Sequence, residues 1–164
     1  MPATKIIFLD FDGPLCNHRV TAATGSMEAF DQYAIAVLRK VCDLSGAKIV
    51  CTSTRAPLYE GGRKDIVAQW FADAGMGAEY LHPDWSCRYD NTKGGRREHI
   101  ARWLTEHPDC SIRDTVTIDD NFVDVPNLVQ VNRYDGLMSG HFMQIMTAFV
   151  LDPQHLYKDI VRQI

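Results

Sequence analysis

Short apolar runs alternate with segments of helical spacing along this sequence, and no other feature limits the possible folds as strongly. Four runs suit buried strands, namely KIIFLD, AKIVCTS, DTVTID and LVQVN, and a weaker one is AEYLH. Strands that alternate with helices form parallel sheets, because a parallel connection must cross the sheet and is usually helical. The sequence therefore predicts an α/β fold in three layers, with an open, mostly parallel sheet and helices on both faces.

The segments between these runs carry apolar residues on one side of a helix. We expect helices around residues 30–44, 66–71, 100–104 and 139–149. Residues 13–27 and 83–95 are rich in Gly, Pro, Asn, Ser and Asp, so we expect loops there, the first forming a short flap beside a site. With 164 residues, 46% of them hydrophobic, the chain can bury one core, and we expect residues 1–164 to form a single domain.

The bulk composition gives few clues to a partner. The net charge of −4 at pH 7 provides no general attraction to nucleic acid or to an anionic membrane. The five cysteines are odd in number and contain no C-x-x-C pair, which favours reduced thiols over a disulfide framework. The N-terminus lacks the pattern of a signal peptide, and no apolar run approaches the roughly 20 residues needed to cross a bilayer. We therefore expect a cytoplasmic protein without a membrane partner.

Side chains that can react or bind metal follow three of the predicted strands. Because the carboxyl ends of parallel strands meet at one edge of a sheet, we expect these side chains to lie together. Clustered carboxylates repel one another unless a hard cation neutralises them, and Mg²⁺ held by carboxylates and a phosphate is the usual cation. The pattern thus predicts a metal site. The residues are Asp10 and Asp12 after the first strand, Thr52, Ser53 and Thr54 after the second, and Asp119, Asp120 and Asp124 at the end of DTVTID.

These segments resemble, in the same order, the four motifs of the haloacid dehalogenase-like (HAD) superfamily. The motifs are FLDFDGPL, IVCTSTR, a basic segment that begins at Lys93, and IDDNFVD. The run RREHIARWL, followed by IDD, is also similar to HAD domains that are fused to RNA-repair enzymes. The resemblance covers residues 5 to about 125. It implies a Rossmann-like fold and a Mg²⁺-dependent phosphatase that hydrolyses a phosphomonoester through an aspartyl-phosphate.

The resemblance implies roles for the residues of the first two motifs. Asp10 is expected to be the nucleophile, and Asp12 to protonate the leaving group and then activate water. Gly13 is expected to keep the turn after them open and to take part in binding the phosphate or substrate. Ser53 is expected to donate hydrogen bonds to the phosphoryl oxygens.

The resemblance also implies the metal ligands. Asp120 is expected to bind Mg²⁺ together with the side chain of Asp10 and the carbonyl of Asp12. Asp119 and Asp124 belong to the same acidic motif and are further candidate metal residues.

Two residues compete for the role of the cation that balances charge on the transferring phosphoryl group. Lys93 is the residue type usual in the superfamily, whereas Arg96 lies closer to the acidic motif and begins a helical pattern. Both remain candidates, and we expect the one that is not catalytic to contact substrate. Thr54 and Arg55, next to Ser53, are expected to bind phosphate or substrate.

The spacing of the motifs leaves no room for a large cap domain. In the HAD superfamily the cap usually sets specificity, so the resemblance implies an open site for a phosphorylated substrate such as a nucleotide or the end of a nucleic acid. His18 and Arg19 lie in the expected flap, where they can touch such a substrate.

Three alternatives stay open. A receiver-like phospho-acceptor module also carries acidic residues, Thr or Ser, and Lys at strand ends, although its acidic pair and its phosphorylated Asp lie on different strands. A catalytically silent HAD-fold binding module is the second, because Pro14 replaces the usual Thr or Val and has no N–H to donate. A phosphotransferase is the third, since it shares the covalent half-reaction with a hydrolase.

Overall fold

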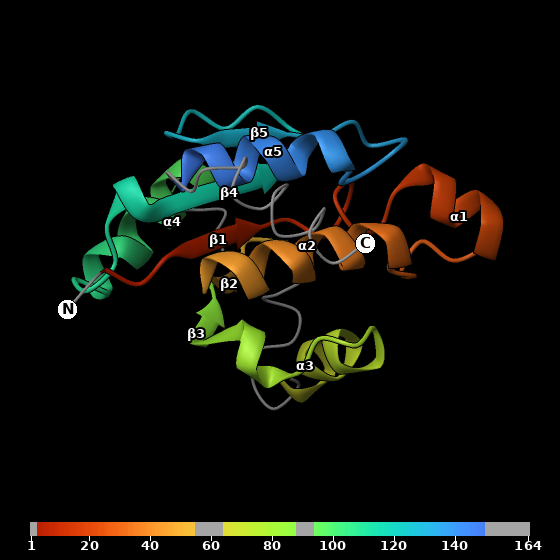
Figure 1. Ribbon diagram of the computed structural model, residues 1–164, viewed down its shortest axis with the longest axis horizontal. Coiled ribbons are helices and arrows are strands. Elements are labelled where there is room, and N and C mark those ends of the chain that lie inside the picture. The colour runs from red at the N-terminus through yellow and green to blue at the C-terminus, as the bar shows by residue number, and fades with distance from the viewer. Residues whose placement is uncertain (1–2, 55–63, 88–93, 150–164) are drawn as a thin grey trace, which may run out of the picture.

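The computed structural model describes residues 3–54, 64–87 and 94–149, which contain one open parallel sheet (Figure 1). Its five strands lie in the order β3-β2-β1-β4-β5, and every neighbouring pair is parallel. This arrangement confirms the expected α/β fold. The strands are β1 (Ile6–Leu9), β2 (Lys48–Cys51), β3 (Leu81–Ser86), β4 (Thr115–Asp119) and β5 (Leu128–Gln130).

Helices pack on both faces of this sheet, with α2 and α5 on the near side in Figure 1 and α4 on the far side. The α-helices of the described residues are α1 (His18–Thr24), α2 (Gln32–Ser45), α3 (Lys64–Asp73), α4 (Arg96–Glu106) and α5 (Ser139–Ala148). The four helices expected from apolar spacing are thereby confirmed. Within the same residues, no helix combines the length and the apolar character needed to cross a membrane.

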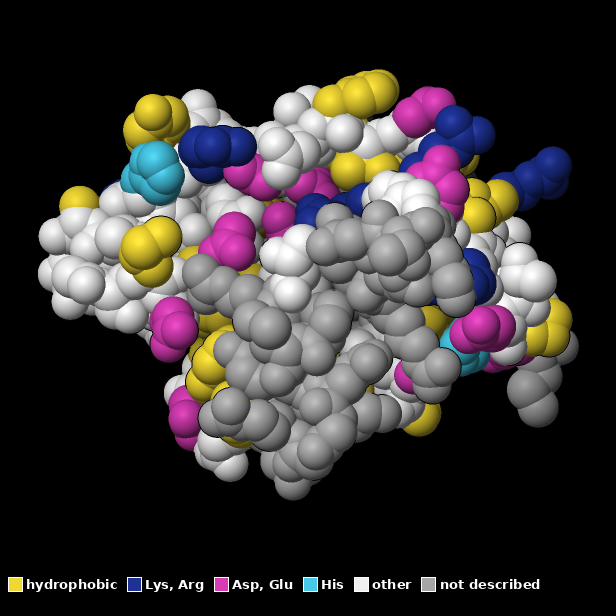
Figure 2. Space-filling model, turned by 180° about the vertical axis from the view of Figure 1, so that it is seen from behind, with side chains coloured by type: hydrophobic (Ala, Val, Ile, Leu, Met, Phe, Trp, Pro, Cys, Tyr) yellow, Lys and Arg dark blue, Asp and Glu magenta, His cyan; other side chains and the backbone are white. Residues whose placement is uncertain are grey.

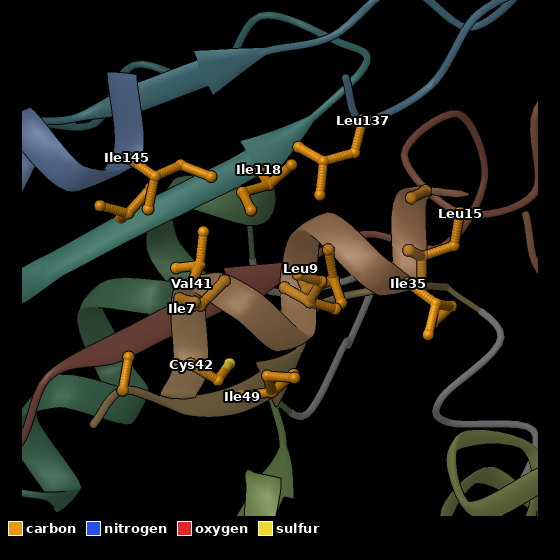
Figure 3. Close-up of a cluster of buried hydrophobic side chains, with 14 of the residues drawn as sticks. Ile7, Leu9, Leu15, Ile35, Val41, Cys42, Ile49, Ile118, Leu137 and Ile145 are labelled. Carbon is orange, nitrogen blue, oxygen red and sulfur yellow. The ribbon is translucent and has the colours of Figure 1, made fainter. Parts of the chain in front are cut away.

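The alternation of side chains along β1 builds two cores, one on each face of the sheet. Ile7 and Leu9 join the larger cluster, which includes residues of α2 and α5 (Figure 3). Ile6 and Phe8 point the other way and join a smaller cluster with Trp103 of α4. A strand that is buried on both faces has to be apolar throughout. The continuous run at the start of the sequence is thus explained by its central place in the sheet.

The expected loop over residues 13–27 contains a short helix, α1. The side chain of Asn17 accepts a hydrogen bond from the backbone N–H of Val20 at 2.9 Å and so caps the N-terminus of the helix. Gly25 ends the helix with a left-handed φ of 73°. Apolar spacing does not reveal α1, because none of its residues is buried.

The expected loop over residues 83–95 is wrong at its start, where β3 continues through Pro83 to Ser86. Proline fits here because β3 lies at the edge of the sheet, where one side of the strand has no ladder bonds to lose. The weaker strand is expected at AEYLH, just before this loop. In the structure, Ala78–Tyr80 of that run forms a 3-10 turn, and the strand begins only at Leu81.

The register of the sheet brings distant residues to the same level. Leu9 pairs with Cys51 of β2 on one side and with Ile118 of β4 on the other. The backbone N–H of Asp10 donates to the carbonyl of Ile118 at 3.0 Å, which extends the ladder by one step. Asp10 and Asp119 therefore leave their strands side by side at the carboxyl edge, where open α/β sheets bind ligands.

Candidate active site

Three carboxylates converge at the carboxyl edge of the sheet. Asp10 follows β1 and is 4% exposed, Asp119 ends β4 and is fully buried, and Asp120 comes directly after it. One carboxylate oxygen of each lies within 4.8 Å of the other two. Hard divalent cations such as Mg²⁺ prefer oxygen ligands of this kind. The donor set fits such an ion, so these three aspartates could hold a metal.

Arg96, the first residue of α4, brings a positive charge to the cluster. Its Nη1 lies 3.2 Å from Oδ2 of Asp10, and the same nitrogen donates a hydrogen bond to Oδ2 of Asp119. The Arg96 side chain is only 17% exposed. Burial raises the pKa of Asp10 to about 6, while Arg96 opposes this effect and Asp119 adds to it. Charges of both signs thus meet where little water screens them, which strengthens their interaction.

A second arginine, Arg133, reaches the cluster from the segment after β5. Its Nη2 lies 3.1 Å from Oδ2 of Asp120. Burial raises the pKa of Asp120, and the charge of Arg133 works in the opposite direction. Arg133 is absent from the residues selected on sequence grounds. Its position just beyond the last parallel strand places it at the same edge of the sheet, but this position alone does not show that its side chain enters the site.

Asn121 orders the two acidic residues that precede it. Its backbone N–H donates to Oδ1 of Asp119 at 2.9 Å, and its side-chain amide donates to Oδ1 of Asp120 at 3.0 Å. These two bonds leave the Oδ2 atoms of both aspartates facing the arginines. Asn121 therefore fixes the side-chain orientation of both aspartates.

The turn after β1 requires glycine at position 13. Gly13 has a φ of 98°, and a Cβ atom there would lie 2.5 Å from Cβ of Asp120. The backbone N–H of Gly13 donates to the carbonyl of Cys16 at 3.0 Å, which closes the turn. This close approach places Asp12 and Asp120 on the wall of the same pocket.

The second motif contributes at least one residue to that pocket. Thr54 is exposed and lines it, whereas Ser53 is fully buried. Lys93 and Arg55, the other candidate cations, lie outside the described residues. Arg96 is thus the candidate for the catalytic cation whose contacts the structure describes.

The structure does not bring Asp124 to the carboxylate cluster. Its side chain is 75% exposed and forms an ion pair of 2.9 Å with Arg97. Both residues lie beside a larger hollow of about 700 Å³, between α4 and residues 124–126, whose walls are mostly apolar. None of the three clustered aspartates lines that hollow, so it is not the candidate active site.

Two of the three clustered aspartates, Asp10 and Asp120, line a separate pocket of about 360 Å³. This volume is at the lower end of the range of about 300–1,000 Å³ that is typical of small-molecule sites. Acidic and basic side chains lie close together on this part of the surface (Figure 2). The charged residues on its walls are Asp10, Asp12, Arg96, Asp120 and Arg133, and α1 contributes His18.

Comparison with known proteins places this site in a family. The family model described as the HAD domain in Swiss Army Knife RNA repair proteins matches residues 6–145, which run from β1 into α5. No curated protein and no solved structure matches the chain. The matched segment holds the carboxylate cluster and both arginines that contact it. The chain therefore belongs to the family of HAD domains found in Swiss Army Knife RNA repair proteins.

Proposed function

We propose that this protein is a Mg²⁺-dependent phosphomonoester hydrolase that works through an aspartyl-phosphate on Asp10. The observation that supports this proposal best is the contact of Asp10 with Arg96 at 3.2 Å, inside a cluster of three carboxylates. A phosphoryl group next to Asp10 needs positive charge on its equatorial oxygens and an anionic nucleophile in line. The cluster supplies the nucleophile and the metal ligands, and Arg96 supplies positive charge from the protein.

The reaction proceeds in two displacement steps. A carboxylate oxygen of Asp10 attacks phosphorus, the ester P–O bond breaks, and Asp12 gives its proton to the departing oxygen. Asp12 then takes a proton from water, whose oxygen attacks phosphorus and breaks the bond to Asp10, so that inorganic phosphate leaves. Asp12 suits both steps because it lines the same pocket as Asp10, two residues further along the turn.

Asp10, Asp119 and Asp120 are the residues that would hold Mg²⁺, and the carbonyl of Asp12 is a further candidate ligand. When bound, the ion supplies charge that offsets the phosphoryl oxygens and the carboxylates together. Arg96 then acts as the remaining fixed cation, with Lys93 as the alternative.

The proposed substrate is a nucleotide or the phosphorylated end of a nucleic acid. Two observations support this choice. The pocket opens at the surface, and the described residues include no cap domain above it. The matching family model is described by its occurrence in RNA repair proteins.

Phosphate release from a substrate panel tests the proposal. The panel holds oligonucleotides with a 3′- or 5′-phosphate, mononucleotides, a sugar phosphate and a phosphopeptide, each assayed with Mg²⁺ and with a chelator. We expect Mg²⁺-dependent release by the wild type and none by Asp10→Asn. Asp73→Asn, on the exposed end of α3, is the matched control and should behave as the wild type.

Other outcomes would replace the proposal. Equal release by wild type and Asp10→Asn, or none from any substrate, would favour a silent binding module. A stable phosphoprotein without turnover would favour a receiver-like module. Transfer of phosphate to an added alcohol in preference to water would identify a phosphotransferase.

A further inference from the structure

An aromatic pair stands beside the pocket and takes no part in the proposed chemistry. The rings of His18 and Tyr134 meet edge to face, with centroids 4.6 Å apart and planes at 83°. His18 lines the pocket that contains Asp10, and Tyr134 is 61% exposed next to it. A large aromatic side chain exposed at the mouth of a charged pocket has contact area available for a ligand.

Backbone hydrogen bonds hold this pair in place. The N–H of His18 donates to the carbonyl of Arg133 at 3.0 Å, and the N–H of Arg19 donates to the carbonyl of Tyr134 at 3.1 Å. The start of α1 and the segment after β5 are thus joined directly, although they lie more than 100 residues apart in sequence. Two elements tied in this way present the rings in a fixed arrangement.

Close packing between the segment after β5 and the turn before α1 adds to these hydrogen bonds. A Cβ atom at Gly136 would lie 2.4 Å from the side-chain amide of Asn17 and 2.8 Å from the carbonyl of Pro14. The N–H of Leu137 donates to that same carbonyl at 3.0 Å. The wall that carries His18 and Tyr134 is therefore built before any ligand binds, and preorganisation lowers the entropic cost of binding.

The surroundings of the aromatic pair combine apolar and basic character. Met27 is exposed and lines the same pocket as His18, so a further apolar side chain borders the site. Arg133 precedes Tyr134 and points its guanidinium to Asp120 inside the pocket. At the upper left of Figure 2, hydrophobic, histidine and basic side chains lie next to acidic ones. Aromatic surface next to arginine is the combination that binds single-stranded nucleic acid, through stacking and charge.

We propose that His18 and Tyr134 form a stacking platform for the base of the nucleotide whose phosphate is removed. The proposal rests on the proposed function, because the reacting phosphate must lie against Asp10 in the same pocket. The pocket volume of about 360 Å³ exceeds what a phosphate group alone needs, which leaves room for the sugar between the two. Stacking accepts any base, since every base has an aromatic face.

Matched substrates that differ only in the terminal base test the platform. We would compare short oligonucleotides whose phosphorylated end carries either adenine or an abasic sugar. Stacking of a base on an aromatic side chain strengthens binding by roughly 5- to 150-fold per base. We expect the wild type to prefer the adenine substrate in kcat/KM by about 10-fold or more, and Tyr134→Ala to lose most of this preference while its rate on the abasic substrate stays near that of the wild type.

Two variants separate stacking from a structural effect. Tyr134→Phe keeps the ring and should keep the preference. Tyr33→Ala removes another exposed tyrosine, which lies on α2, and should also keep it. An equal loss on both substrates in Tyr134→Ala, or no preference in the wild type, would overturn the platform.

A binding measurement separates this inference from the proposed hydrolysis. The Asp10→Asn protein is titrated with adenosine monophosphate and with ribose phosphate, with and without the additional change Tyr134→Ala. Base-dependent binding that Tyr134→Ala abolishes supports the platform even if the wild type hydrolyses nothing. Turnover without base-dependent binding leaves the hydrolase intact and rejects the platform.

Discussion

Arg96 and Arg97 are neighbours at the start of one helix, yet they occupy opposite surroundings. Arg96 is 17% exposed and contacts the fully buried Asp119, as well as Asp10. Arg97 is 60% exposed, and its partner Asp124 is 75% exposed. Asp119 and Asp124 come from the same acidic segment of the sequence, IDDNFVD. Residue type and sequence spacing are therefore alike in the two pairs, and burial is what differs.

The difference matters because water decides what an ion pair contributes. An exposed pair contributes about 0–1 kcal/mol, since solvent screens it and two long side chains must be held still. Removing one partner of a buried pair costs about 3–5 kcal/mol, because a charge is left without compensation. The same contrast governs catalysis, as a fixed charge acts most strongly on a reacting group where water is excluded. Arg96 lies where little water reaches it, whereas Arg97 is exposed to solvent.

Replacing the two arginines in turn is the most direct way to break the comparison. Arg96→Gln should lower kcat for phosphate release by about 10²- to 10³-fold. Without Mg²⁺ it should also lower the free energy of unfolding by roughly 3 kcal/mol, since two buried carboxylates lose their counter-charge. Arg97→Gln should change the free energy of unfolding by less than about 0.5 kcal/mol.

Urea unfolding and steady-state kinetics measure both effects on the same preparations. Equal effects of the two variants would remove the distinction between the pairs. Retained activity in Arg96→Gln would transfer the role of the catalytic cation to Lys93, and Lys93→Gln would then be the variant that loses turnover.

The pH dependence of stability sharpens the buried side of the comparison. Burial raises the pKa of Asp10 from 3.8 to about 6, so the folded protein holds this proton more tightly than the unfolded chain. The resulting stability is fully present below pH 3.8 and is lost as pH rises through about 6. The loss amounts to about 3 kcal/mol at pH 7. Without Mg²⁺, Asp10→Asn should therefore unfold less readily than the wild type at pH 7.

Unfolding experiments from pH 4 to pH 8 test this expectation. The advantage of Asp10→Asn should shrink as pH falls through 6 and disappear near pH 4. Added Mg²⁺ should reduce it at pH 7, because the ion stabilises the ionised carboxylates of the wild type. A difference between the two proteins that stays constant with pH would contradict the raised pKa of Asp10.

Arg133 is an intermediate case, since its half-exposed side chain contacts a mostly buried carboxylate, Asp120. As a neighbouring positive charge it opposes the binding of a metal ion. Arg133→Gln should therefore tighten Mg²⁺ binding by roughly 2- to 5-fold, in keeping with the modest strength of part-exposed ion pairs. Arg133→Lys keeps the charge and should bind Mg²⁺ as the wild type does.

Calorimetric titration at low and high salt measures the change in Mg²⁺ affinity, which should shrink as salt screens the charge. Weaker Mg²⁺ binding in Arg133→Gln would mean that Arg133 orders Asp120 for the metal.

Much of the fold could be predicted because the strands at the centre of the sheet are buried on both faces. Ile6–Leu9 of β1 is buried along its whole length, and such a strand must be apolar without alternation. Thr115–Asp119 of β4 is also buried throughout, although Thr115 and Thr117 alternate there with apolar residues. Apolar spacing also marks α2 and α5, which cover one face. It cannot mark α1, which depends on the polar cap at Asn17 and buries nothing.

The same reasoning explains which part of the site could be predicted. Asp10 and Asp119 are carried by strand ends, so the topology of the sheet is enough to bring them together. Arg133 and Asp124 lie in irregular segments after β5 and β4, where no periodicity describes the path of the backbone. Position after a strand therefore does not tell which of them enters the pocket. In the structure Arg133 does so and Asp124 does not.

The smallest expected effect is at Asp124, and it tests where the acidic motif ends. Asp119→Asn removes a carboxylate that would hold the ion and should weaken Mg²⁺ binding by at least about 10-fold, since losing even a group that only supports a metal ligand has an effect of this size. Asp124→Asn should change it by less than about two-fold, because an exposed carboxylate paired with Arg97 contributes little at a distance. Calorimetric titration of both variants makes the comparison. If Asp124→Asn weakens Mg²⁺ binding as much as Asp119→Asn does, the segment after Asn121 must fold toward the pocket when metal binds. The exposed pair with Arg97 would then be a feature of the metal-free protein alone.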